Sequence, residues 1–152
     1  MIIFGVIAFI TGYIVSGDSV ALAMHIQTLS HLYGPAVIVS ESTAQAAGRG
    51  FAFLEVATIA ADGGGAVKLY ALLGNPATRA SPKFLALQTF HEHIFRLAKA
   101  GQWGKARELI AQCRKLSGAS QKLYDLHLAR IAWFEKHPPG SDWDGAFRNL
   151  LK

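Results

Sequence analysis

The spacing of the apolar residues changes close to residue 78, and this change limits the folds that are open to the chain. Before it, short apolar runs such as 51–59 and 66–73 alternate with glycine-rich turns, which is typical of strands. After Ser81, apolar residues recur every three or four positions, which indicates amphipathic helices. We therefore expect an α+β fold (an α/β sandwich), with a sheet-and-helix domain over 1–78 and a helical extension over 79–152.

The charge changes at the same place. Residues 1–78 hold two basic and four acidic side chains, whereas residues 79–152 hold thirteen basic and six acidic ones. Asn75 with Pro76, and Ser81 with Pro82, are turn signals at this junction, which supports a boundary there. Basic and acidic residues alternate in the second part, unlike the single-signed stripe that binds nucleic acid. We expect no nucleic-acid partner.

Few residues have the types and spacing that a metal site needs. The single cysteine, Cys113, excludes an intrachain disulfide and a cysteine-based metal site, and it favours a reducing compartment. His91 and His93 are two positions apart, so on a helix they point to different faces and cannot bind one metal together. His127 and His137 stand isolated in the sequence. We expect no metal site and a cytoplasmic location.

The first 17 residues carry no charge, which is close to the lower length limit for a membrane span. No lysine or arginine precedes or follows this stretch to orient it, and Gly5 and Gly12 interrupt it. We favour two buried strands, over 4–10 and 13–15, around a turn. Membrane insertion is the alternative, and retention in the pellet after carbonate washing would support it.

The rest of the first part predicts the order βαβαββ. A helix begins near Ser19, with the apolar stripe Leu22, Ile26, Leu29 and Tyr33. A strand over 36–39 and a short helix over 40–47 follow. The runs 51–59 and 66–73 form a hairpin around a glycine-rich loop over 62–65. No helix with Lys and Ser or Thr follows this loop, so we do not expect it to bind phosphate.

The second part predicts about three helices, each with an apolar stripe. The first stripe is Leu87, Phe90, Ile94 and Leu97; the second is Trp103, Ala106, Ile110 and Cys113; the third is Leu123, Leu126, Arg130 and Trp133. The turn over 100–106 is similar to that of tetratricopeptide-like helical hairpins, but it occurs once. Trp143 lies in a polar tail, and we expect it to pack on a neighbouring surface.

Four stretches together resemble the C-terminal half of a class III nucleotide cyclase domain. Residues 13–25 (YIVSGDSVALAMH) are similar to the family pattern Y-T-V-x-G-D-x-V-N-L-A-x-R. The family pattern L-x-x-x-Y-G is matched next by Leu29, Tyr33 and Gly34. The family pattern I-x-x-S-E-x-T is matched by residues 37–43 (VIVSEST). Residues 67–74 (VKLYALLG) resemble the last strand of the family's domain, and the helical part resembles the tail of bacterial sensor-linked members.

The resemblance implies a family reaction, from ATP to cyclic AMP and pyrophosphate, in sites that two head-to-tail protomers form with Mg²⁺ or Mn²⁺. The family's two metal-binding aspartates lie earlier in its domain than any residue of this chain. The family position that contacts the purine corresponds to Ile14. Ala21 stands where the family has the asparagine that orients the ribose, and His25 stands where it has the arginine that stabilises the transition state. The family's hairpin lysines fall between 60 and 65, where this chain has none.

Gly17, Asp18 and Val20 match the frame of the nucleotide site that the resemblance implies. Ala21 and His25 are four positions apart and share a helical face, but they offer neither the amide nor the permanent cation of the family. Losing one such transition-state contact costs roughly 10²–10³ in rate. We therefore expect an adenylate/guanylate cyclase-homology protein that is truncated and catalytically silent alone, with no cofactor of its own and no basis for tight ATP binding.

Two kinds of partner follow from these expectations. The resemblance implies a homodimer, or a heterodimer in which this chain pairs with a cyclase domain and regulates it. The alternative is a non-enzymatic module in which the helices over 79–152 bind another protein.

Overall fold

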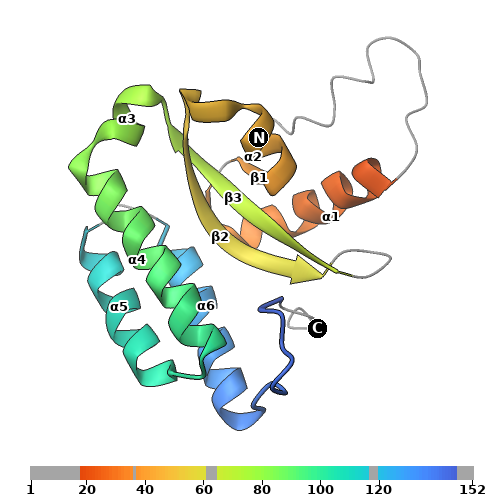
Figure 1. Ribbon diagram of the computed structural model, residues 1–152, viewed down its shortest axis with the longest axis vertical. Helices are drawn as coiled ribbons and strands as arrows, with labels where there is room; N and C mark the ends of the chain where they lie inside the picture. The colour runs from red at the N-terminus through yellow and green to blue at the C-terminus, as the bar shows by residue number, and fades with distance from the viewer. Residues whose placement is uncertain (1–17, 36, 61–64, 117–119, 147–152) are drawn as a thin grey trace.

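The chain has an α+β fold in the computed structural model, which describes residues 18–35, 37–60, 65–116 and 120–146 (Figure 1). Helices α4, α5 and α6 are grouped on one side, and α1 and α2 lie against a small sheet. The elements in chain order are α1 (Asp18–Tyr33), β1 (Ile38–Ser40), α2 (Glu41–Ala46), the 3₁₀ turn η2 (Gly48–Gly50), β2 (Ala52–Ala60), β3 (Ala66–Gly74), α3 (Pro76–Ala80), α4 (Pro82–Lys99), α5 (Trp103–Leu116) and α6 (Gln121–Lys136).

The described sheet has three antiparallel strands in the order β1-β3-β2. The predicted hairpin is confirmed, because β2 and β3 pair along their whole length from Ala52 opposite Gly74 to Ala60 opposite Ala66. A β-bulge between Glu55 and Ala57 shifts the register by one residue. The predicted strands over 4–10 and 13–15, and most of the hairpin loop, lie outside the described residues.

The two faces of the sheet differ in polarity. Ile38, Ala71 and Leu54 lie opposite one another on one face, and all three are buried. Ile38 and Ala71 belong to a core cluster with Tyr33 of α1 and Leu123 of α6. Side chains alternate between faces along a strand, so the neighbouring positions lie on the other face. That second face, which carries Glu55 and Tyr70, we call the polar face.

Helices α4, α5 and α6 share a core with the sheet. Ala52 and Leu54 of β2 belong to one cluster with Phe84, Ile110 and Tyr124 of the three helices. The core therefore crosses residue 78, and the two parts that the charge distribution separates pack against each other. Because hydrophobic burial is the main favourable term in folding, we expect each part to stabilise the other.

The predicted helical stripes are confirmed for α4 and α5 and partly wrong for α6. Leu87, Ile94 and Leu97 are buried on α4, and Ala106, Ile110 and Cys113 on α5. On α6, Leu123 and Arg130 are buried as expected, but Trp133 is 42% exposed, and the neighbouring positions Ile131 and Phe134 are buried in its place. Helix α6 carries apolar residues on two adjacent stripes, and its contacts with α1, α4 and α5 decide which one is buried.

The junction between the parts contains a helix that the sequence analysis missed. Asn75 Oδ1 accepts a hydrogen bond from the Thr78 backbone N–H at 3.1 Å, and Pro76 is the first residue of α3. Ser81 Oγ accepts from the Phe84 N–H at 3.2 Å and begins α4 in the same way. A capping side chain followed by proline is a helix start as well as a turn signal. Among the described residues, four helices, one of them short, therefore follow the hairpin.

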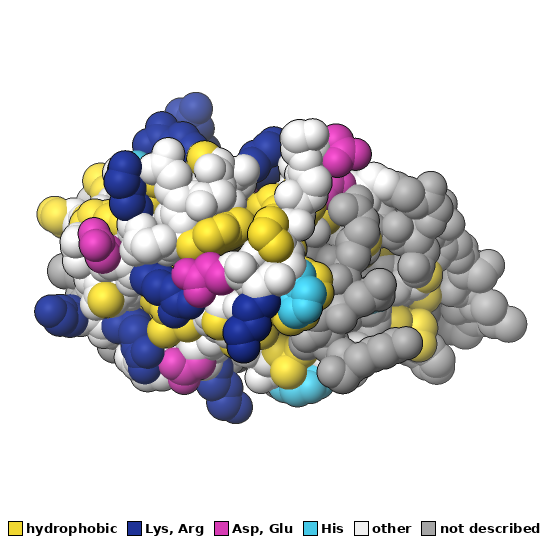
Figure 2. Space-filling model, turned by 90° about the horizontal axis from the view of Figure 1, so that it is seen from below, with side chains coloured by type: hydrophobic (Ala, Val, Ile, Leu, Met, Phe, Trp, Pro, Cys, Tyr) yellow, Lys and Arg dark blue, Asp and Glu magenta, His cyan; other side chains and the backbone are white. Residues whose placement is uncertain are grey.

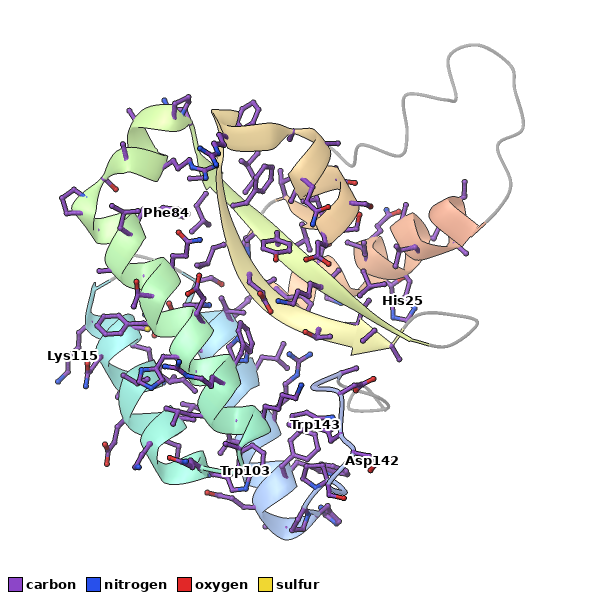
Figure 3. All side chains as sticks on the ribbon, viewed as in Figure 1. His25, Phe84, Trp103, Lys115, Asp142 and Trp143 are labelled. Carbon is purple, nitrogen blue, oxygen red and sulfur yellow. The ribbon has the colours of Figure 1, made fainter. Side chains whose placement is uncertain are left out.

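The predicted packing of Trp143 is confirmed. Its ring centroid lies 4.8 Å from that of Phe134 and 6.4 Å from that of Trp103. Figure 3 labels both tryptophans. Trp103 in turn stacks on Phe134 at 5.7 Å. The tail up to residue 146 is thus fixed on the ends of α5 and α6. Among the described residues, none of the helices combines the length and the apolarity that crossing a bilayer requires.

Candidate functional site

The stretch around Gly17, where the resemblance implies a nucleotide site, is only partly described. Ile14 and Gly17 lie outside the described residues, and Asp18 is the first residue of α1. Val20 is half-buried, whereas Ala21 and His25 are exposed, as expected for two residues four positions apart on one face. Figure 3 labels His25 on this helix.

Helix α1 presents a continuous exposed surface, which we call the outer face of α1: Ala21, Met24, His25 and Thr28. Its opposite side is buried through Ile26 and Tyr33. Met24 is 65% exposed, the largest exposed fraction of any large apolar side chain among the described residues. Thr28 Oγ1 donates to the Met24 carbonyl oxygen at 3.0 Å, so its hydroxyl is engaged by its own helix.

The outer face of α1 is suited to contact rather than to catalysis. It offers a methyl group, a thioether, an imidazole and a hydroxyl, but no permanent cation and no carboxylate. Among the residues that the structure describes, no three His, Cys, Asp or Glu side chains come close enough to hold a metal ion. A thioether is flexible and polarizable, and methionines are frequent on surfaces that bind other proteins.

The polar face of the sheet holds a small ionic cluster. Lys68 Nζ donates to Glu55 Oε2 at 2.9 Å across the β2–β3 pair. This hydrogen bond raises the pKa of Lys68. Burial, and next the negative charge of Glu55, raise the pKa of Tyr70, so its phenol stays neutral near pH 7. The cluster therefore pairs its charges internally and leaves no base or nucleophile poised for reaction.

A small pocket adjoins this cluster, between α2, the sheet, α3 and α4. It has a volume of about 190 Å³. We call it the aromatic pocket, because Phe51, Phe53, Tyr70 and Phe84 line it together with Glu41 and Arg79. Figure 3 labels Phe84 on α4.

Two histidines that lie 36 positions apart in the sequence, His91 and His127, come together in the core. The ring centroids of His91 and His127 are 6.3 Å apart, and both side chains are buried. His91 Nδ1 lies 3.0 Å from the Glu55 carbonyl oxygen, and a carbonyl only accepts, so Nδ1 donates. His91 Nε2 then accepts from the Tyr124 hydroxyl at 3.1 Å. Both ring nitrogens of His91 are therefore hydrogen-bonded in the core.

Burial sets the charge state of these histidines. It lowers the pKa of His91 to about 4, and it lowers the pKa of His127 as well, with the nearby Arg130 adding to the effect. Arg130 Nη2 donates to the Tyr33 hydroxyl at 3.0 Å and so connects α6 to α1. The cluster is closed to solvent and links four elements, so its role is to hold the helices on the sheet.

The described charged side chains are mixed in sign on one face of the molecule. On the face of the molecule seen in Figure 2, Lys and Arg side chains alternate with Asp, Glu and apolar ones. Comparison with known proteins returned no match to a family model, a curated protein or a solved structure. The functional assignment therefore has to come from the chain's own surfaces: the outer face of α1 and the aromatic pocket.

Proposed function

We propose that this chain is an adenylate/guanylate cyclase-homology protein that makes no cyclic nucleotide itself and acts by pairing with a second cyclase-like domain. The observation that carries the proposal is the outer face of α1. Ala21 and His25 are exposed side by side there, at the positions where the resemblance requires an asparagine and an arginine. Helix α1 is thus exposed in the way that a nucleotide site shared with a partner would require, but it lacks the asparagine and the arginine that would act on the nucleotide.

The order of the described elements supports the same proposal. Helix α1 is followed by β1, the short helix α2 and the β2–β3 hairpin, which is the order that the resemblance implies for this part of a cyclase domain. Ser40 begins α2 by accepting a hydrogen bond from the Thr43 N–H at 3.4 Å, within the S-E-x-T stretch of the family pattern. A fold of this kind places α1 at the edge of the molecule, where a partner can reach it.

The first test is for activity. Purified chain incubated with ATP or GTP and Mn²⁺ or Mg²⁺ should form no cyclic nucleotide above the blank, while an intact class III cyclase run in parallel should. The variant A21N/H25R should remain inactive, because restoring an amide and a guanidinium does not supply metal-binding carboxylates. Formation of cyclic AMP or cyclic GMP by the unmodified chain would falsify the non-catalytic part of the proposal.

The second test is for pairing. Added to an intact class III cyclase of the same organism, the chain should change the cyclase rate, and the two should co-sediment in analytical ultracentrifugation. Met24→Asp should abolish both effects, because it puts a charge in the centre of the apolar contact. Leu85→Asp is the matched control, since Leu85 is 52% exposed on α4, away from the outer face of α1.

The outcomes of the pairing test are distinct. No effect of the unmodified chain on rate or sedimentation, with self-association also absent, would contradict pairing. An effect that Leu85→Asp removes and Met24→Asp preserves would move the contact to the helical extension, which is the alternative partner surface.

The proposal includes a cytoplasmic location. Its support is the use of cysteine: the chain has one, Cys113, which is buried, and burial raises the pKa of its thiol. A buried thiol with a raised pKa is inert, as is common for core cysteines in reducing compartments. Fractionation of tagged protein, with carbonate washing of the membranes, tests the location directly.

A further inference from the structure

The aromatic pocket combines an apolar lining with two opposite charges. Phe53 and Phe84 both line it, and Phe84 is buried. Phe51, also in the lining, is 43% exposed and lies edge-on to Phe53, with ring centroids 6.2 Å apart. Exposed aromatic rings around a concavity are a common feature of small-molecule sites.

The two charged residues of the pocket do not neutralise each other. Among the described residues, neither Glu41 nor Arg79 forms a salt bridge. The negative charge of Glu41 contributes, more weakly than other causes, to the raised pKa values of Lys68 and Tyr70. Arg79 donates from Nη1 to the Phe51 carbonyl oxygen, a long hydrogen bond of 3.5 Å that positions the guanidinium at the pocket. Arginine has five N–H donors, so this bond leaves most of them for a ligand.

We propose that the aromatic pocket binds a free amino acid with an apolar side chain. The ligand carboxylate binds Arg79, the ammonium group binds Glu41, and the side chain lies on the phenylalanine rings. Charge-assisted hydrogen bonds to a carboxylate are among the strongest in proteins, and arginine forms them in pairs. A volume of about 190 Å³ is below the roughly 300–1,000 Å³ of sites for drug-sized ligands, which restricts the ligand to a small molecule.

The presence of one carboxylate and one guanidinium in the same pocket argues against other ligand classes. A phosphate-bearing ligand would meet the carboxylate of Glu41, and a simple cation would meet the guanidinium of Arg79. A neutral apolar ligand would take both charged groups from water without a partner, which is costly. A zwitterion satisfies both groups at once. Gln45 and Gln88 also line the pocket and can complete the hydrogen bonds of the ammonium and the carboxylate.

This site is separate from the pairing proposal. The pocket is built by α2, the sheet, α3 and α4, whereas pairing rests on α1. The experiment is titration of the full chain with leucine and phenylalanine, followed by isothermal calorimetry and thermal shift. The methyl ester and the N-acetyl derivative of each are titrated in parallel, because each removes one charge. The free amino acid should bind roughly tenfold or more tightly than either derivative.

Two variants assign the charges. Arg79→Gln should remove the preference for the free amino acid over its methyl ester. Glu41→Gln should remove the preference for the free amino acid over its N-acetyl derivative. Arg96→Gln and Glu92→Gln, exposed changes of the same kind on α4, should leave both preferences intact. No heat and no thermal shift with leucine or phenylalanine at millimolar concentration would overturn the proposal. Equal binding of the blocked derivatives, or free amino-acid binding unchanged in Arg79→Gln, would do so too.

Discussion

Replacing Gly34 by alanine should lower the free energy of unfolding by about 3 kcal/mol or more, which is large for the addition of one methyl group. Gly34 has φ of +89°, a conformation that side chains with a Cβ rarely adopt. A methyl group there would also overlap the hydroxyl of Ser120 and lie 2.9 Å from its Cβ. Ser120 cannot simply move, because its Oγ donates to the Tyr33 carbonyl oxygen at 2.8 Å. Urea unfolding followed by circular dichroism measures the effect.

Gly48→Ala is the matched control for the Gly34 prediction. Gly48 also has a positive φ, +65°, but nothing lies within 4 Å of the position that a Cβ would take. It should therefore cost only the backbone strain, about 1 kcal/mol. The double variant G34A/S120G should recover part of the Gly34→Ala loss, because it removes the side chain that the methyl group meets. If the two single variants prove equally stable, the close approach of Gly34 and Ser120 is not a real constraint.

Acidification from pH 6.5 to pH 4 should destabilise the chain by up to about 3 kcal/mol through His91 alone. The pKa of His91 is lowered from 6.5 in the unfolded chain to about 4 in the folded one, chiefly by burial. Above pH 6.5 both states are neutral, so stability does not depend on this proton. As the pH falls from 6.5 to about 4, the unfolded chain binds a proton that the folded chain does not, so the free energy of unfolding decreases. The lowered pKa of His127 acts in the same direction.

The contribution of His91 can be isolated with His91→Gln. A glutamine can donate to the Glu55 carbonyl and accept from Tyr124, but it does not titrate. The variant should lose the part of the slope of unfolding free energy against pH that His91 supplies, while Tyr124→Phe should be less stable at every pH and keep that slope. Urea unfolding at closely spaced pH values gives the slopes. A His91→Gln slope equal to that of the unmodified chain would show that His91 is protonated in the folded state as readily as in the unfolded one.

The parts of the fold that the sequence predicted are those with local signals. The hairpin follows from two apolar runs around a glycine-rich loop, and α2 from the capping side chain of Ser40. The same kind of local signal was misread at the junction, where Asn75 and Ser81 begin helices. Asparagine or serine followed by proline is found both in turns and at helix starts. Only the tertiary contacts of the residues that follow decide between a turn and a helix.

The parts that the sequence could not predict join residues far apart in the chain. His91 and Tyr124 are 33 positions apart, and Arg130 and Tyr33 are 97 apart, yet each pair is hydrogen-bonded in the core. Neither pair has a spacing that any local pattern marks. On α6, the predicted position Trp133 and the buried position Phe134 are adjacent in the sequence. A local pattern does not separate two such positions, and the neighbouring helices decide which one is buried.

The same limit applies to the candidate sites. The exposure of Ala21 and His25 follows from their spacing on α1, and the resemblance drew attention to them. The aromatic pocket had no such signal, because Glu41 and Arg79 come from different helices and only the sheet between them brings them to one concavity. Ordinary residue types at long separation become a site only through the fold.

The hydrogen bonds that hold helices to β2 also bear on how the protein behaves at high concentration. Strand β2 is nine residues long, largely apolar, and at the edge of the described sheet. Such an edge can recruit strands from other molecules and start aggregation. Here the carbonyl of Glu55 in β2 is already bonded to His91, and the carbonyl of Phe51, just before the strand, is bonded to Arg79. These two side chains therefore also occupy acceptors along this edge, and losing them should promote aggregation before it promotes unfolding.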